Sequence, residues 1–124
     1  MERIVTEKAP KPIGPYSQAI KFGNLVFTSG QIGIDPNTGK ITEGEIEQEA
    51  EQVFCNLARV LEAAGTRFQN AVKVTVFMTD LSNFPRVNRV YARYFKEPFP
   101  ARSCFQVAAL PAGARIEIEI VAGC

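Results

Sequence analysis

Residues 45–64, EIEQEAEQVFCNLARVLEAA, and residues 72–78, VKVTVFM, decide the fold of this chain. The first stretch repeats apolar residues at helical spacing and predicts a long amphipathic helix that ends at Gly65. Thr42 and Glu45 form a capping-box pattern at its start. In the second stretch, β-branched residues alternate with other residues, which is typical of a strand. A helix with one apolar side, followed by a strand, indicates a sheet with a helix packed on it.

Further strands and a second helix surround this pair of elements. Two strand-like segments within residues 17–29 flank the turn signal Gly23-Asn24 and predict a hairpin. A second helix is expected after Asp80 or Ser82, and two more strands follow Pro100. The predicted fold class is α+β, a single sheet of about six strands covered on one face by two helices. The other face meets either water or another subunit.

Length and composition predict one soluble domain that spans residues 1–124. Apolar residues make up 46% of the chain and charged residues 22%, and no apolar run is long enough to cross a bilayer. The first residues have no basic segment followed by an apolar segment, so we expect no signal peptide and a cytoplasmic protein. The three widely spaced cysteines favour reduced thiols over disulfides or a zinc site.

Charge and residue types narrow the chemistry. The net charge of +1 comes from 14 basic and 13 acidic residues scattered along the chain, so nucleic acid is not the expected partner. The chain has no histidine, the usual general base and the commonest metal ligand. We therefore expect no metal, and any acid–base step falls to carboxylates, tyrosine, cysteine or water.

Arg102 and Glu117 are the main candidates for chemistry. Arg102 alternates along its strand so that it shares a face with Cys104, and its guanidinium suits a carboxylate through two parallel hydrogen bonds. The ordinary alternative is an arginine at the rim that forms a surface ion pair. Glu117 shares a face with Glu119, and such a pair is more often the solvated side of an amphipathic strand. Together, Arg102 and Glu117 suit a small anionic substrate and a water beside it.

Spacing alone does not bring these two residues together. If the last two strands formed a simple hairpin, Arg102 would lie about 13 Å from Glu117 along the strand pair. A shared site then needs either another strand between them or a boundary between two subunits. The sequence leaves both arrangements open.

Asn88 and Cys104 each have two interpretations. Asn88 lies on one helical stripe with the aromatic residues Phe84 and Tyr91, where it either bonds a backbone carbonyl in the core or lines a pocket. Cys104 has no histidine to deprotonate it, so a structural thiol is favoured over a nucleophile.

Five motifs span nearly the whole chain: GPYSQA (14–19), TSGQ (28–31), DLSNF (80–84) with Asn88 and Tyr91, FPARSC (99–104) and RIEIE (115–119). The two at the C-terminal end are the most specific. Together the five motifs resemble the RidA (YjgF) family of reactive-intermediate deaminases.

The resemblance implies a chorismate-mutase-like fold and a homotrimer whose sheets form a central barrel, with three clefts between subunits. Deaminases of the family hydrolyse 2-imino acids such as 2-iminobutanoate and 2-iminopropanoate, or their enamine tautomers, to 2-oxo acids and ammonia without a cofactor. The imines come from pyridoxal-phosphate-dependent dehydratases that act on threonine or serine.

The resemblance also implies roles for individual residues. Arg102 would bind the substrate carboxylate, Glu117 would orient or activate water, and Cys104 would contribute through its backbone. The cleft would be lined by Tyr16, Ser29, Gly30 and Asn88. The alternative function is a module that binds small carboxylates such as 2-oxo acids. A ribonuclease, a translation inhibitor or a chaperone-like holdase is less favoured. The near-neutral charge and the missing histidine argue against RNA cleavage.

Overall fold

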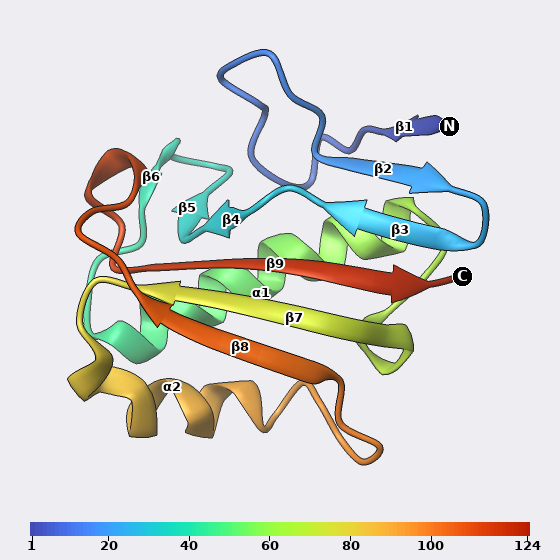
Figure 1. Cartoon of the computed structure of the whole chain (residues 1–124). Coiled ribbons are helices and arrows are strands. Elements are labelled where there is room, and N and C mark those ends of the chain that lie inside the picture. Colours follow the sequence, from blue (N-terminus) through green and yellow to red (C-terminus); the bar gives the residue numbers. More distant parts are fainter.

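A mixed sheet forms the frame of the computed structural model, which describes residues 1–124 (Figure 1). Its strand order is β1-β2-β3-β9-β7-β8, and β4 also pairs with β9, which gives seven strands where the sequence predicted about six. The extra strand arises because the line of β3 breaks at Ser29-Gly30 and resumes as β4 against the same neighbour. The strands are β1 (Glu2–Ile4), β2 (Ala19–Phe22), β3 (Leu25–Thr28), β4 (Gln31–Ile32), β7 (Ala71–Met78), β8 (Ala101–Gln106) and β9 (Ile116–Gly123).

The hairpins follow the turn signals of the sequence. Gly23 has a φ of 62° between β2 and β3, in the left-handed region that glycine adopts without strain. A separate two-stranded hairpin, β5 (Ile34–Asp35) and β6 (Lys40–Ile41), lies beside the main sheet. The predicted hairpin within residues 17–29 is therefore confirmed.

Strand β7 lies between β8 and β9. It pairs parallel to β8 and antiparallel to β9, so β8 and β9 are not neighbours and do not form a hairpin. The chain passes from β8 to β9 through a short 3-10 turn at Pro111–Gly113. Of the two arrangements left open by the sequence, the intervening strand is thus present.

The long helix α1 (Ile46–Ala63) matches the predicted span of 45–64 within a residue at each end. The predicted capping box is wrong: Glu45 is the N-cap residue, and no side chain caps the helix. The Thr42 hydroxyl instead lies 3.5 Å from Oε1 of Gln52, inside the helix. Neither α1 nor the second helix has the combination of length and apolar character that crossing a membrane requires.

The second helix, α2 (Phe84–Tyr91), follows a 3-10 turn at Leu81–Asn83. Asp80 accepts a hydrogen bond of 2.9 Å from the backbone N–H of Ser82 and so caps this 3-10 turn. The N-cap residue of α2 itself is Asn83, so the helix starts later than a cap at Asp80 or Ser82 implies. The helix ends at Tyr91, and the chain continues in turns to Pro98.

Both helices pack on one face of the sheet (Figure 1). Helix α1 runs behind the strands, and α2 runs alongside β8. The core between the layers is a single cluster of 23 buried apolar residues. Phe54 of α1 is fully buried at its aromatic centre. Its ring lies 4.6 to 6.1 Å from the ring centroids of Phe68, Tyr91, Tyr94 and Phe95.

The other face of the sheet carries no helix and is rich in aromatic residues. Phe22 is 66% exposed and Phe105 is 52% exposed, and Phe27 is also exposed. Phe77 stacks on Phe105 with a centroid distance of 6.2 Å. An apolar surface of this kind is typical of a face that another molecule covers.

We expect Phe54→Ala to lower the free energy of unfolding by about 3 to 5 kcal/mol, because it leaves a cavity among four aromatic rings. Cys55→Ala, at the next and exposed position, is the control. The measurement is denaturant unfolding at one fixed protein concentration. Equal losses in the two variants would contradict this assignment of the core.

Candidate functional site

Arg102 projects from β8 toward the helices. It is in register with the fully buried Val74 of β7, and residues directly paired across strands point to the same face. Arg102 Nη1 donates a hydrogen bond of 2.8 Å to Asn88 Oδ1. The guanidinium carbon lies 4.6 Å from the ring centroid of Tyr91 and 5.0 Å from that of Phe84. Helix α2 therefore restrains the guanidinium plane.

The guanidinium remains available to a ligand. Arg102 forms no ion pair within the chain, so the surface ion pair considered from the sequence is not made. A guanidinium has five N–H donors, and Asn88 occupies one of them. Arg102 lines an open cleft of about 360 Å³ with Asn88, Tyr91, Phe99 and Pro100. This cleft offers a positive charge with aromatic walls, which suits a small carboxylate.

Glu117 projects from β9 away from the helices. Its strand neighbours Ile116 and Ile118 are fully buried against α1, and side chains alternate along a strand. Burial raises the pKa of the Glu117 carboxyl above its ordinary value, and the carboxylate of Glu119 on the same face raises this pKa further. A carboxylate with a raised pKa is a better proton acceptor than a fully solvated one.

Gly30 leaves the space that the Glu117 carboxylate occupies. A Cβ at Gly30 would lie 2.7 Å from Glu117 Cδ, so any larger residue would displace the carboxylate. Glu117, Gly30 and Tyr16 line a cavity of about 80 Å³ beside β4. The close approach explains why glycine occurs at the break between β3 and β4.

Five of the seven predicted site residues form two groups, one in each cavity, and the other two line neither. Tyr16 and Gly30 lie with Glu117, and Asn88 lies with Arg102. Ser29 and Cys104 line neither cavity.

The two remaining residues have local partners. The Ser29 hydroxyl donates a hydrogen bond of 2.5 Å to the carbonyl oxygen of Ser17. Burial raises the pKa of the Cys104 thiol, which keeps it protonated at neutral pH, and Cys104 Sγ lies 4.0 Å from Met78 Sδ. These contacts agree with a structural thiol.

The two groups lie on opposite faces of one sheet. Arg102 points to the helix-covered face and Glu117 to the open face. A single copy of the chain therefore carries two half-sites, and the intervening strand β7 does not by itself bring them together.

Some residues of the Glu117 cavity were not predicted from the sequence. Lys11 and Ile13 line it from the loop before β2, as does Gln18. The Gln18 amide donates hydrogen bonds to the carbonyl oxygens of Thr6 and Pro10, at 3.0 and 2.9 Å, and so closes this loop. In the sequence, Gln18 closely follows the turn residues Gly14-Pro15, which is a weak signal that its side chain closes a loop. An isolated lysine such as Lys11 gives no signal of this kind.

Metal-binding groups do not converge at either half-site. No group of three or more His, Cys, Asp or Glu side chains is placed to hold a metal ion. Arg102 offers a cation with aromatic walls, and Glu117 offers a partly buried carboxylate.

Comparison with known proteins identifies the family. A family model described as Endoribonuclease L-PSP matches residues 6–124. The crystal structure of RidA from the Antarctic bacterium Psychrobacter sp. PAMC 21119 is 47% identical, covers 100% of both chains and superposes with a TM-score of 0.96. The chain belongs to the RidA (YjgF) family.

Two relatives of this RidA-family chain have names that describe an activity. A human protein named 2-iminobutanoate/2-iminopropanoate deaminase is 51% identical over 119 residues, which are 96% of this chain and 87% of the human one. Reactive Intermediate Deaminase A, chloroplastic, of Arabidopsis thaliana is 51% identical over 121 residues, 98% of this chain and 65% of the plant protein. The chain thus spans about two thirds of the length of the plant relative.

We expect Glu119→Gln to lower the pKa of Glu117, because it removes a like charge on the same strand face. The pKa should stay above the ordinary value, since burial is the larger cause. The measurement is an NMR titration of the glutamate side-chain carboxyl carbons. Glu62→Gln, on the exposed side of α1, should leave the Glu117 pKa unchanged. A Glu117 pKa that is the same in all three proteins would contradict the expected coupling.

Proposed function

We propose that this protein is a hydrolytic deaminase of 2-imino acids such as 2-iminobutanoate and 2-iminopropanoate, with 2-oxo acids and ammonia as products. The observation that carries the proposal is 51% identity over almost the whole chain to the human protein of that name. An arginine that is held in place without an ion pair and a partly desolvated glutamate supply the two groups that such a reaction needs. We also propose that residues 1–124 act as one RidA-like domain.

Arg102 binds the substrate carboxylate in this proposal. Its stacking on α2 and its bond to Asn88 leave N–H groups for two parallel hydrogen bonds. The cation is held in place before the substrate arrives, so little conformational freedom is lost on binding. The imine carbon, adjacent to the carboxylate, is then fixed at a short distance from the guanidinium.

Glu117 is the general base in this proposal. Its carboxylate takes a proton from water as the new C–O bond forms at the imine carbon, and it passes this proton to the imine nitrogen, which becomes an amine. Glu117 then takes the proton of the new hydroxyl group and delivers it to the amine, so that the C–N bond breaks, ammonia leaves and the C=O bond forms. Acid–base catalysis of this kind contributes about 10²- to 10⁴-fold. The reaction uses water and the two side chains and needs no cofactor.

We propose that the complete site forms between two copies of the chain, in a homotrimer with three clefts. One copy supplies Arg102 with Asn88, and its neighbour supplies Glu117 with Tyr16 and Gly30. Support comes from the opposite orientation of the two half-sites and from the exposed aromatic face of the sheet. Ser29 and the Cys104 backbone stay predicted contributors to this cleft. A closed ring buries the open sheet face of every copy.

The cytoplasm is the proposed location, although the Arabidopsis relative is called chloroplastic. The proposed partners are the imine substrate and further copies of this chain, with neither nucleic acid nor a membrane required. The net charge of +1 fits this set of partners.

The activity test follows 2-iminobutanoate, released in place by a threonine dehydratase, against its uncatalysed decay. Wild type should accelerate the decay, and Arg102→Ala and Glu117→Gln should each lower the acceleration by about 10²-fold or more. Arg67→Ala and Glu62→Gln change exposed residues of the same types and should act like wild type. Wild-type decay at the background rate would overturn the proposal. If 2-oxobutanoate still bound through Arg102, the module that binds small carboxylates would take its place.

A mixing experiment tests the shared cleft. Arg102→Ala and Glu117→Gln chains, refolded together in equal amounts, should recover about a quarter of the wild-type activity, because one neighbouring pair in four then joins an intact Arg102 to an intact Glu117. Each variant refolded alone is the control and should stay near background. If the mixture is no more active than the two variants alone, both residues act from the same copy.

A further inference from the structure

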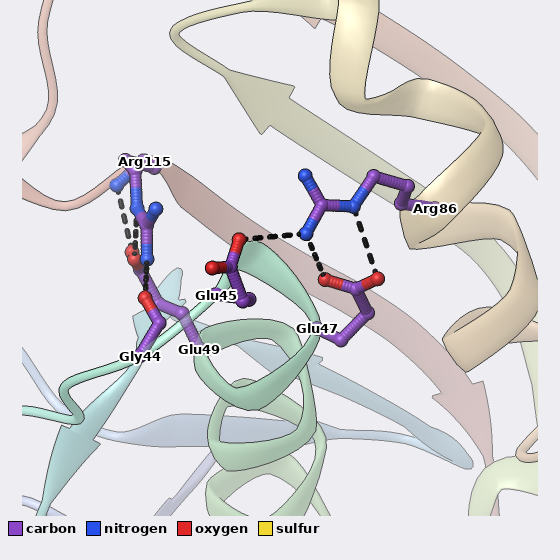
Figure 2. Close-up of polar contacts among 6 residues, drawn as sticks. All are labelled: Gly44, Glu45, Glu47, Glu49, Arg86 and Arg115. Carbon is purple, nitrogen blue, oxygen red and sulfur yellow. Dashed lines mark hydrogen bonds and ion pairs between the residues drawn. The ribbon is translucent and has the colours of Figure 1, made fainter.

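The start of β9, just before Glu117, is tied to α1 by an ion pair that the proposed reaction does not use. Glu49 of α1 is buried, with its side chain 1% exposed. Its Oε1 accepts a hydrogen bond from Arg115 Nε, and its Oε2 accepts one from the backbone N–H of Arg115, both at 2.7 Å. Arg115 Nη2 also donates to the carbonyl oxygen of Gly44 at 2.8 Å (Figure 2). Both oxygens of the Glu49 carboxylate thus hold one residue.

Glu49 also fixes the strand on the other side of Glu117. Ile32 of β4 pairs with Glu117, and the next residue, Gly33, packs closely against Glu49. A Cβ at Gly33 would be 2.8 Å from both Cγ and the carbonyl oxygen of Glu49. Two helical turns after Glu49, the buried Asn56 of α1 donates hydrogen bonds to the carbonyl oxygens of Ile32 and Ile34, at 3.1 and 2.9 Å. Two segments that flank the Glu117 carboxylate are therefore fastened to the same helix.

A purely structural ion pair is the competing explanation. Buried ion pairs are weak sources of stability, because apolar residues of similar volume can replace them at little cost. Here Glu49 is buried while Arg115 is 41% exposed, so the pair fixes geometry because Arg115 must keep its place to avoid an unpaired buried charge on Glu49. Another ion pair at the start of the same helix shows the difference: Arg86 of α2 bonds Glu45 and Glu47 at the surface (Figure 2) and forms no hydrogen bond or ion pair with β4 or β9.

We infer that Glu49 is a positioning residue, which through Arg115 and Gly33 holds β9 and β4 so that Glu117 keeps its partly dehydrated place beside Gly30. The inference deepens the proposed deaminase function and rests on it for its kinetic consequence. Glu49 does not touch the substrate. Loss of the pair loosens the start of β9 and admits water to the Glu117 carboxylate.

The test compares Glu49→Gln and Arg115→Met with wild type, with Glu47→Gln as the matched control. NMR titration reads the pKa of Glu117 whether or not the protein hydrolyses imines. Imine hydrolysis, followed against pH, gives kcat, KM and the midpoint of the acid-side decline. We expect both variants to lower the Glu117 pKa and the acid-side midpoint, because burial is the larger cause of the raised pKa. We also expect kcat to fall about 10-fold with KM within about twofold, since the Arg102 half-site is untouched.

The sign of the change separates the explanations. Glu49→Gln removes a negative charge and Arg115→Met a positive one, so an effect of charge alone moves the Glu117 pKa in opposite directions. A structural role lowers the folded fraction and leaves the pKa and the midpoint of the folded protein unchanged. Either result overturns the inference, and so does a change of the pKa in Glu47→Gln as large as in the other two. If Glu49→Gln does not fold, Arg115→Met decides alone, because positioning predicts a lower pKa and charge a higher one. An inactive wild type with the expected NMR result would overturn the deaminase function and leave the positioning role intact.

Discussion

The alternation of side chains along β-strands is the constraint on which the rest of the account depends. Successive residues of a strand point to opposite faces, and the register of β8, β7 and β9 then assigns each residue to one face of the sheet. Arg102 shares its face with the buried core, and Glu117 lies on the face that no helix covers. No rotation of side chains can bring the two together across a packed sheet. For this reason we propose that a reaction that uses both takes place between two copies of the chain.

The helix-covered face supplies the rigidity that such a divided site needs. Helix α1 holds the centre of the core through Phe54, and it also holds the strands around Glu117 through Glu49 and Asn56. Helix α2 holds Arg102 by stacking and by one hydrogen bond. Arg102, Asn88 and Glu117 thus lie on regular elements, which place side chains more accurately than loops do, whereas Tyr16 and Gly30 lie outside the strands.

Local patterns in the sequence predicted most of the elements. Periodicity over up to about 20 residues predicted the span of α1 and the strand β7. It also predicted that Arg102 shares a strand face with Cys104 and that Glu117 shares one with Glu119. The capping box failed because Thr42 meets Gln52 and leaves the helix end uncapped. The insertion of β7 between β8 and β9 was not predictable from spacing, because strand order depends on contacts between distant parts of the chain.

Parts of the site were hidden for the same reason. The close approach of Gly30 to Glu117 needs the pairing of β4 with β9, which no local pattern reveals. Glu49 did leave a signal: it lies three residues after Ile46 and four before Val53, on the apolar stripe of the helix. A charged residue on such a stripe requires a buried partner, but the sequence does not say that Arg115 provides it.

The most direct test of the divided site is a crystal structure of the Glu117→Gln protein with the product 2-oxobutanoate bound. The account predicts that the carboxylate of the ligand lies on Arg102 of one copy while its carbonyl carbon faces residue 117 of a neighbouring copy. A ligand whose carboxylate and carbonyl groups are both bound by residues of a single copy would contradict it.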